Sequence, residues 1–89
     1  MKIYFTKHAE EKFEVLAKHS FEVSKRQVID TLELPDIIDQ SRSSLLIAQK
    51  KIDQKKVLRV VYKIEFGIIK VITFYPWRSK QYEKETRNN

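Results

Sequence analysis

The chain has no cysteine, one glycine and two prolines among its 89 residues. The absence of cysteine excludes disulfide bonds, thiolate metal ligands and cysteine nucleophiles. No stretch has the charged start, apolar centre and small-residue cleavage site of a secretion signal. No apolar run approaches the ~20 residues that a membrane-spanning helix needs. We therefore expect a cytoplasmic protein with no membrane partner.

The sequence also lacks the motifs of several common active sites. It has no glycine-rich phosphate loop, no paired-histidine metal motif and no Ser/His/Asp signature. Its two histidines, His8 and His19, are about three helical turns apart, which is too far for one metal ion. We therefore expect no metal site and no cofactor.

Positive charge is what the sequence has in excess. Its 18 Lys and Arg outnumber 12 Asp and Glu, which gives a formal net charge of +6, and the cations occur along the whole chain. This balance favours an acidic partner such as nucleic acid, an anionic membrane surface or an acidic protein, and charge alone does not choose among them. A basic surface with no ligand is the alternative.

The C-terminal half predicts a three-stranded antiparallel meander. Runs rich in β-branched and aromatic residues cover 45–52, 57–64 and 68–75, with short turns between them. Because Phe66 is poorly suited to a positive φ and Gly67 is well suited, we expect a type I turn followed by a glycine bulge. Pro76 is expected to end the last strand.

The N-terminal half predicts two amphipathic helices. Thr6 can cap a helix over Lys7–Lys18, in which Ala9, Phe13, Leu16 and Ala17 share one face. A second helix over Lys25–Glu33 begins at a capping box formed by Ser24 and Gln27 and ends before Pro35. Residues 2–5 can form a short edge strand, and residues 35–44 are either a loop or a short strand at 37–38 followed by a loop.

These elements predict an α+β domain over residues 1–83 and a disordered polar tail over 84–89. Two N-terminal helices are expected to pack on one face of a twisted antiparallel sheet of three to four strands. Alternation in the middle strand places Leu58, Val60, Tyr62 and Ile64 on that face. The other face then carries Val57, Arg59, Val61 and Lys63, and we expect it to be solvated or a binding surface.

The side chains needed for RNA cleavage without a metal are present. That reaction needs a base, an acid and cations that stabilise the charge on the phosphorane. His8 can be the base or acid, and tyrosine and tryptophan can stack on unpaired bases. The candidate cations are Lys7, Lys12, Arg42, Lys50, Lys51, Arg59, Lys63, Arg78 and Lys80, and the candidate aromatic residues are Tyr75, Trp77 and Tyr82.

Each of these residues also has a structural interpretation. His8 can be a helix-start residue, and Arg59 can be solvated or paired across strands. Tyr75 can pack on the sheet, and Trp77 can cover the sheet edge without contacting any base. The pattern alone does not distinguish catalysis from packing.

Four segments resemble one family. They are Thr6-Lys7-His8-Ala9-Glu10-Glu11-Lys12, the end of the second helix from Val28 to Asp36, and the strands at 57–62 and 72–76. Together they resemble an uncharacterised group of small proteins related to the RelE/ParE toxin superfamily and to BrnT-like toxins. The similarity covers roughly Ile3 to Tyr82, and its most specific part is the Thr-x-His-Ala helix start.

The resemblance implies a RelE-like fold and a toxin that cuts mRNA, often at the ribosome, until a cognate antitoxin covers its basic surface. ParE-type relatives act on DNA gyrase instead, so fold does not settle the target. The resemblance implies His8 as acid or base, Arg59 and Arg78 as phosphate stabilisers, and Tyr75 or Tyr82 as a stacking or proton-transfer group. No complete family catalytic set can be matched.

Our leading hypothesis is therefore a metal-independent endoribonuclease of a toxin-antitoxin system that binds RNA or the ribosome. The alternative is a non-catalytic module of the same fold that binds nucleic acid or protein. A homodimer is expected if Ile68, Ile72 and Phe74 form an exposed face.

Overall fold

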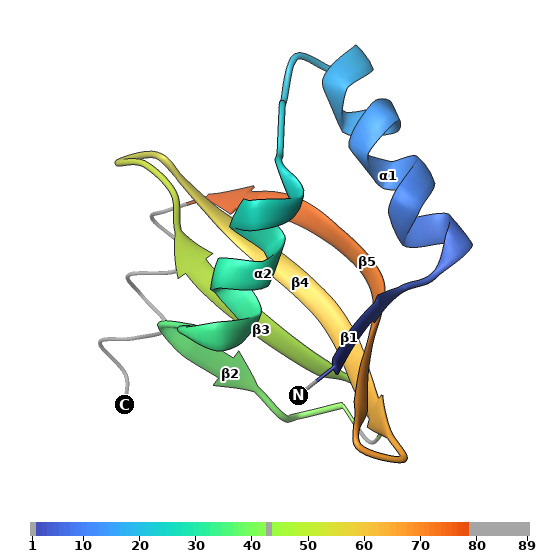
Figure 1. The fold of residues 1–89 in the computed structure, drawn as a ribbon. Helices are drawn as coiled ribbons and strands as arrows, with labels where there is room; N and C mark the ends of the chain where they lie inside the picture. Colours follow the sequence, from blue (N-terminus) through green and yellow to red (C-terminus); the bar gives the residue numbers. More distant parts are fainter. Residues whose placement is uncertain (1, 43, 79–89) are drawn as a thin grey trace.

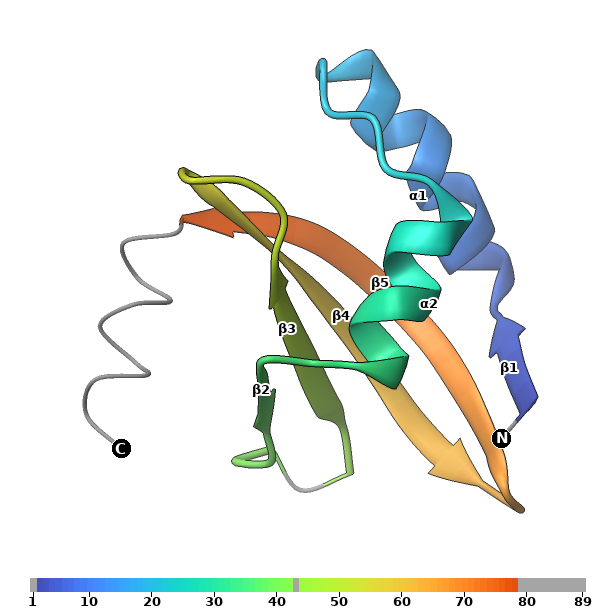
Figure 2. The same cartoon turned by 60° about the vertical axis from the view of Figure 1, so that its left-hand side comes forward.

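The computed structural model describes residues 2–42 and 44–78. The elements are, in order, β1 (Lys2–Phe5), α1 (Lys7–Lys18), α2 (Lys25–Glu33), β2 (Ile37–Asp39), β3 (Leu46–Lys51), β4 (Lys56–Glu65) and β5 (Ile68–Arg78) (Figure 1). The expected tail at 84–89, Lys80 and Tyr82 lie outside the described residues. The α+β class and the two helices on one face of a sheet are confirmed (Figure 2).

The expected antiparallel sheet of three to four strands is wrong in its strand count and in one pairing. The sheet has five strands in the order β1-β5-β4-β3-β2. β1 pairs parallel with β5, from Lys2 with Ile68 to Phe5 with Val71, whereas the other pairings are antiparallel. β1 and β2 are only four and three residues long, which leaves little alternation to read from the sequence.

Both predicted helix starts are confirmed. The Oγ1 atom of Thr6 accepts a hydrogen bond from the Ala9 N–H at 3.2 Å. The same hydroxyl donates to the Val71 carbonyl at 3.0 Å, so the cap also fixes the start of α1 against β5. At α2, the Ser24 and Gln27 side chains each accept a hydrogen bond from the other's backbone N–H, which is the predicted capping box.

The main core lies between the helices and the sheet. Its buried members are Ala9, Leu16, Val28, Leu58, Val60, Val71 and Phe74. Phe74 is fully buried and its ring centroid lies 4.6 Å from that of Phe13. The expectation that Phe74 belongs to an exposed dimerisation face is therefore wrong.

The β4–β5 connection also differs from the prediction. Glu65 pairs with Ile68, so the loop contains only Phe66 and Gly67, with φ values of 52° and 73°. Two consecutive positive φ angles in a two-residue loop are the mark of a type I′ turn rather than a type I turn with a glycine bulge. The ion pair of Glu65 with Lys70 at 2.7 Å joins the two strands beside this turn, and Glu65 also contacts Lys63 of its own strand at 3.2 Å.

β5 does not end at Pro76 but continues to Arg78, with Pro76 paired to Leu58. The partner strand β1 reaches β5 only as far as Val71. Beyond that point the outer side of β5 is an edge, where a residue without an N–H is tolerated. The continuation matters because it keeps Tyr75 and Trp77 within the sheet.

Candidate nucleic-acid interface

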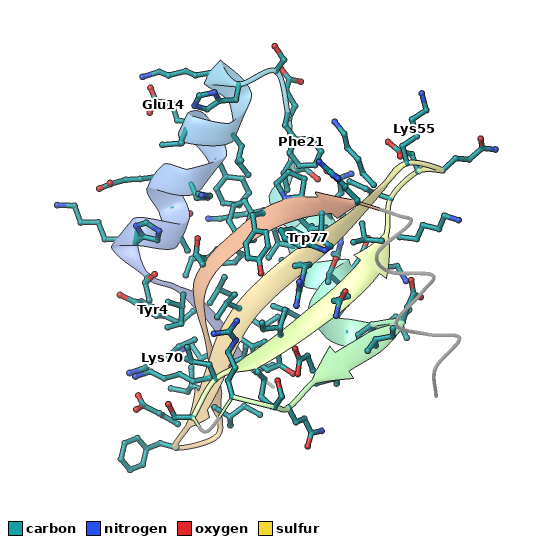
Figure 3. The ribbon with its side chains drawn as sticks, turned by 180° about the vertical axis from the view of Figure 1, so that it is seen from behind. Tyr4, Glu14, Phe21, Lys55, Lys70 and Trp77 are labelled. Atoms are coloured by element: carbon teal, nitrogen blue, oxygen red, sulfur yellow. The ribbon has the colours of Figure 1, made fainter. Side chains whose placement is uncertain are left out.

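The candidate site lies on the sheet face that is turned away from the two helices. Gln49, Arg59 and Tyr75 are register partners on three adjacent strands, β3, β4 and β5. Their neighbours Leu58 and Phe74 belong to the core beneath the helices, so alternation directs the three partners to the opposite face. Figure 3 shows the molecule from this side, with Trp77 over the sheet.

Arg59 lies against two aromatic rings. The central carbon of its guanidinium is 5.7 Å from the centroid of the Tyr75 ring and 5.4 Å from that of Trp77. The two rings are themselves 6.0 Å apart in an edge-to-face arrangement. Such cation–π contacts are strongest where water is excluded, and Arg59 is only 9% exposed. The site is therefore a buried cation flanked by two aromatic side chains.

Asp39 of β2 provides a negative charge beside this cation. Its Oδ2 lies 3.7 Å from an Arg59 terminal nitrogen, and its Oδ1 accepts a hydrogen bond from the Ser41 N–H at 2.9 Å. Hydrogen bonds from Ser41 lower the pKa of Asp39, and the charges of Arg59 and Arg42 lower it further. Asp39 is thus a carboxylate near neutral pH and offsets part of the Arg59 charge.

One donor and one acceptor remain unmatched at the centre of the face. The Arg59 Nε and the Gln49 Oε1 are both buried, and neither has a hydrogen-bond partner among residues 2–42 and 44–78. Unpaired buried polar atoms are rare and cost roughly 1–3 kcal/mol each.

His8 is not brought to this cluster. It is the second residue of α1, it is exposed, and its helix begins beside Val71 on the core side of the sheet. Tyr75 is four residues further along β5, which is more than about 10 Å along a strand, and on the opposite face. The four predicted catalytic residues therefore do not converge on one point.

The other predicted cations are distributed around the molecule. Lys7 and Lys12 are on α1, and Arg42 is an exposed residue of the loop between β2 and β3. Lys51 ends β3, and Lys63 on β4 is held by Glu65. Lys50, at the end of β3 with Lys51, donates to the Leu34 carbonyl at 2.8 Å. These residues do not form one continuous cationic surface with Arg59.

Arg78 instead lines a cleft at the end of the sheet where the β3–β4 turn lies beside the end of β5. Its lining residues are Lys55, Lys56, Pro76, Trp77 and Arg78. The sequence pattern alone did not identify Lys55, Lys56, Asp39 or Gln49 as site residues. Gln49 is polar within an apolar run, which is a usable signal, whereas Asp39 meets Arg59 only through pairing across three strands.

Within residues 2–42 and 44–78, no group of three or more His, Asp or Glu side chains is arranged to hold a metal ion. No helix in this part of the chain is long and apolar enough to span a membrane. When the chain is compared with protein-family models, curated proteins and solved structures, none of them matches. The residues of the site are therefore the evidence for function.

Proposed function

We propose that this protein is a toxin-like endoribonuclease that binds single-stranded RNA on the sheet face turned away from α1 and α2 and cuts it without a metal. The observation that carries the proposal is Arg59, whose guanidinium lies beside both the Tyr75 and Trp77 rings. Unpaired RNA presents phosphates next to exposed base faces, and it is recognised by arginine and aromatic side chains in combination. The cationic cleft beside Trp77 extends this surface.

The RelE-like part of the proposal rests on the sequence resemblance. The two N-terminal helices packed on one face of a sheet are compatible with it. By the same resemblance, mRNA on the ribosome is the proposed target, and a cognate antitoxin that covers the basic face is the proposed partner. Induced expression of the native chain should then arrest bacterial growth, with cleaved mRNA accumulating.

In the proposed reaction the RNA 2′-hydroxyl attacks the adjacent phosphorus and loses its proton to water. The new 2′-O–P bond forms as the P–O5′ bond breaks, which gives a 2′,3′-cyclic phosphate and a 5′-hydroxyl end. Arg59 stabilises the charge on the phosphorane, and the Tyr75 hydroxyl gives a proton to the leaving 5′-oxygen. We place His8 outside this reaction because it lies on the other side of the sheet.

The test is cleavage of end-labelled RNA in the presence of EDTA, with RNA affinity measured on the same samples. Native protein should cut the RNA. Tyr75→Phe should cut about 100-fold more slowly while binding nearly as well, because only the proton donor is lost. His8→Ala should cut at close to the native rate. Failure of the native protein to bind RNA would overturn the proposal entirely.

The second candidate is a non-catalytic RNA- or protein-binding module. It is favoured by the separation of His8 from Arg59, since the predicted acid or base does not reach the phosphate stabiliser. Under this alternative, RNA binds and depends on Arg59, but no cleavage products form and Tyr75→Phe has no effect beyond affinity. The cleavage assay therefore distinguishes the two candidates directly.

A further inference from the structure

The cleft beside Trp77 has the size and lining of a small-molecule site. Its volume is about 530 Å³, within the range of roughly 300–1,000 Å³ that is usual for ligand pockets. Lys56 is the register partner of Arg78, and Lys55 precedes it in the turn between β3 and β4. Figure 3 shows Lys55 at the tip of this turn, at the same end of the sheet as Trp77.

The three cations of the cleft, Lys55, Lys56 and Arg78, have no carboxylate partner within the described residues. Lys56 lies over the Phe21 ring, with its Nζ 4.9 Å from the ring centroid. The nearby acid, Asp53, accepts hydrogen bonds from the backbone N–H groups of Lys55 at 2.7 Å and Lys56 at 2.8 Å, so this carboxylate orders the turn. The cleft therefore retains an excess of positive charge.

Elsewhere on the surface, several cations are paired with acids, whereas others such as Lys2 and Lys7 are exposed and have no acid partner among the described residues. Arg26 contacts Asp30 at 3.0 Å and Glu33 at 3.2 Å, and Lys25 contacts Glu10 at 3.2 Å. What distinguishes Lys55, Lys56 and Arg78 from those other unpaired cations is that the three line one concave site together. They favour an anionic ligand at this place.

The other walls of the cleft indicate what else the ligand carries. Pro76 is apolar, and the Trp77 ring is 41% exposed and so available for stacking. An aromatic face next to cations fits a nucleobase joined to a phosphate. A terminal phosphate monoester carries about −1.5 to −2 charge near neutral pH, more than the single charge of an internal diester, so three cations favour the monoester.

We propose that this cleft binds a nucleotide through its terminal phosphate and its base. The source is either the phosphorylated end of an RNA strand or a free nucleotide. The RNA source rests on the proposed function. Trp77 contacts Arg59 and also lines the cleft, so a strand whose end is bound in the cleft would continue to Arg59. The cleft itself does not depend on that function.

Trp77 makes the test direct, because it is the only tryptophan in the chain and its fluorescence reports on the cleft. The native protein is titrated with adenosine, with AMP, and with one short RNA that carries a 5′-phosphate, a 3′-phosphate or neither. AMP should quench the fluorescence saturably and bind at least about tenfold more tightly than adenosine, since charge-assisted hydrogen bonds to the phosphate are lost in adenosine. Equal affinity for AMP and adenosine would overturn the proposal.

The double variant Lys55→Gln, Arg78→Gln should lose this preference while unfolding at the native temperature. Lys2→Gln is the matched control, since Lys2 pairs with Ile68, about 30 Å along β5 from Arg78. This control should retain the preference. A double variant that is folded and still prefers AMP would also overturn the proposal.

The RNA arms separate this proposal from the proposed function. Tighter binding of a phosphorylated RNA identifies the strand end as the source, whereas AMP binding without that gain identifies a free nucleotide. AMP binding without any RNA binding would support the cleft proposal and contradict the proposed RNA function. RNA that binds and is cut, when neither AMP nor the phosphorylated RNA binds more tightly than its unphosphorylated counterpart, would overturn the cleft proposal and keep the function. Arg59→Gln should weaken binding of unphosphorylated RNA and leave the AMP preference intact.

Discussion

Arg59 carries a positive charge at a position that is almost closed to solvent. Its charge is offset by Asp39 at 3.7 Å, and its planar group lies against two rings. These contacts depend on a flat, delocalised guanidinium, which lysine does not have. The identity of the cation at this position should therefore matter as much as its charge.

Arg59→Lys should accordingly weaken RNA binding by about tenfold or more, because the lysine can neither stack on Tyr75 and Trp77 nor bind a phosphate through two nitrogens. Fluorescence anisotropy with a labelled single-stranded RNA measures the effect. Lys7→Arg on α1 is the control for a lysine–arginine exchange outside the site. Native affinity in Arg59→Lys would show that Arg59 acts only as a diffuse charge.

Asp39 should make stability depend on pH. Its pKa in the folded protein lies below the ordinary value of 3.8, chiefly because of Ser41. A carboxyl group with a lowered pKa stabilises the fold above its unfolded pKa, and this contribution is lost as the pH falls through the folded pKa. Native protein should therefore be more stable than Asp39→Asn at pH 6, and the difference should shrink below about pH 4. Urea unfolding at several pH values measures it, and a constant difference would contradict this account.

At the scale of secondary structure, the β4–β5 turn carries unfavourable backbone geometry. Phe66 has a φ of 52° and a fully exposed side chain, so no packing described here compensates for the conformation. A non-glycine residue in the left-handed region costs about 1–2 kcal/mol, and less for asparagine. The pairing of β4 with β5 and the ion pairs of Glu65 hold the turn in this conformation despite the unfavourable φ of Phe66.

Phe66→Asn should therefore stabilise the protein by about 1 kcal/mol, because Asn-Gly is the preferred pair for a type I′ turn. Gly67→Ala is the reciprocal variant. An added Cβ at Gly67 would meet no atom within 4 Å, so its expected loss of about 1 kcal/mol would come from the backbone alone. Denaturant unfolding measures both changes. Destabilisation by Phe66→Asn would mean that the Phe66 ring has a packing role.

The elements differ in how far the sequence could predict them. The helix starts at Thr6 and Ser24 were predictable because a cap involves residues within one turn of chain. The parallel pairing of β1 with β5 was not, because it joins residues more than 60 positions apart and leaves no local pattern. The predicted turn type was wrong for a related reason, because the pairing of β4 with β5 overrode the local backbone preference of Phe66.

The site was partly predictable for the same reasons. Strand alternation predicts that Arg59 lies on the face opposite Leu58. In the structure, Tyr75 of β5 is the register partner of Arg59 and so lies beside it. To predict that Asp39, Lys55 and Lys56 lie at the site, one would need the register of strands that are far apart in the sequence. His8 was selected for its chemistry and its family-like motif, neither of which carries information about which side of the sheet α1 covers.

At the scale of the whole molecule, the two faces of the sheet differ in the residues that they carry. The helices cover one face and form the main core with it, and three of their five Lys and Arg side chains are paired with acids. The other face carries Arg59 with its aromatic partners and ends at the cationic cleft. The account's central claim is that RNA binds on this second face.

The most direct test of this claim is the salt dependence of RNA affinity for three proteins of matched stability: native, Arg59→Gln and Lys7→Gln. For single strands, the logarithm of the affinity should fall by about 0.7 per phosphate contact for each tenfold rise in salt. Arg59→Gln should weaken binding and reduce this slope by about one contact, whereas Lys7→Gln on α1 should leave both unchanged. A slope that Arg59→Gln does not alter, or an equal loss in Lys7→Gln, would contradict the account.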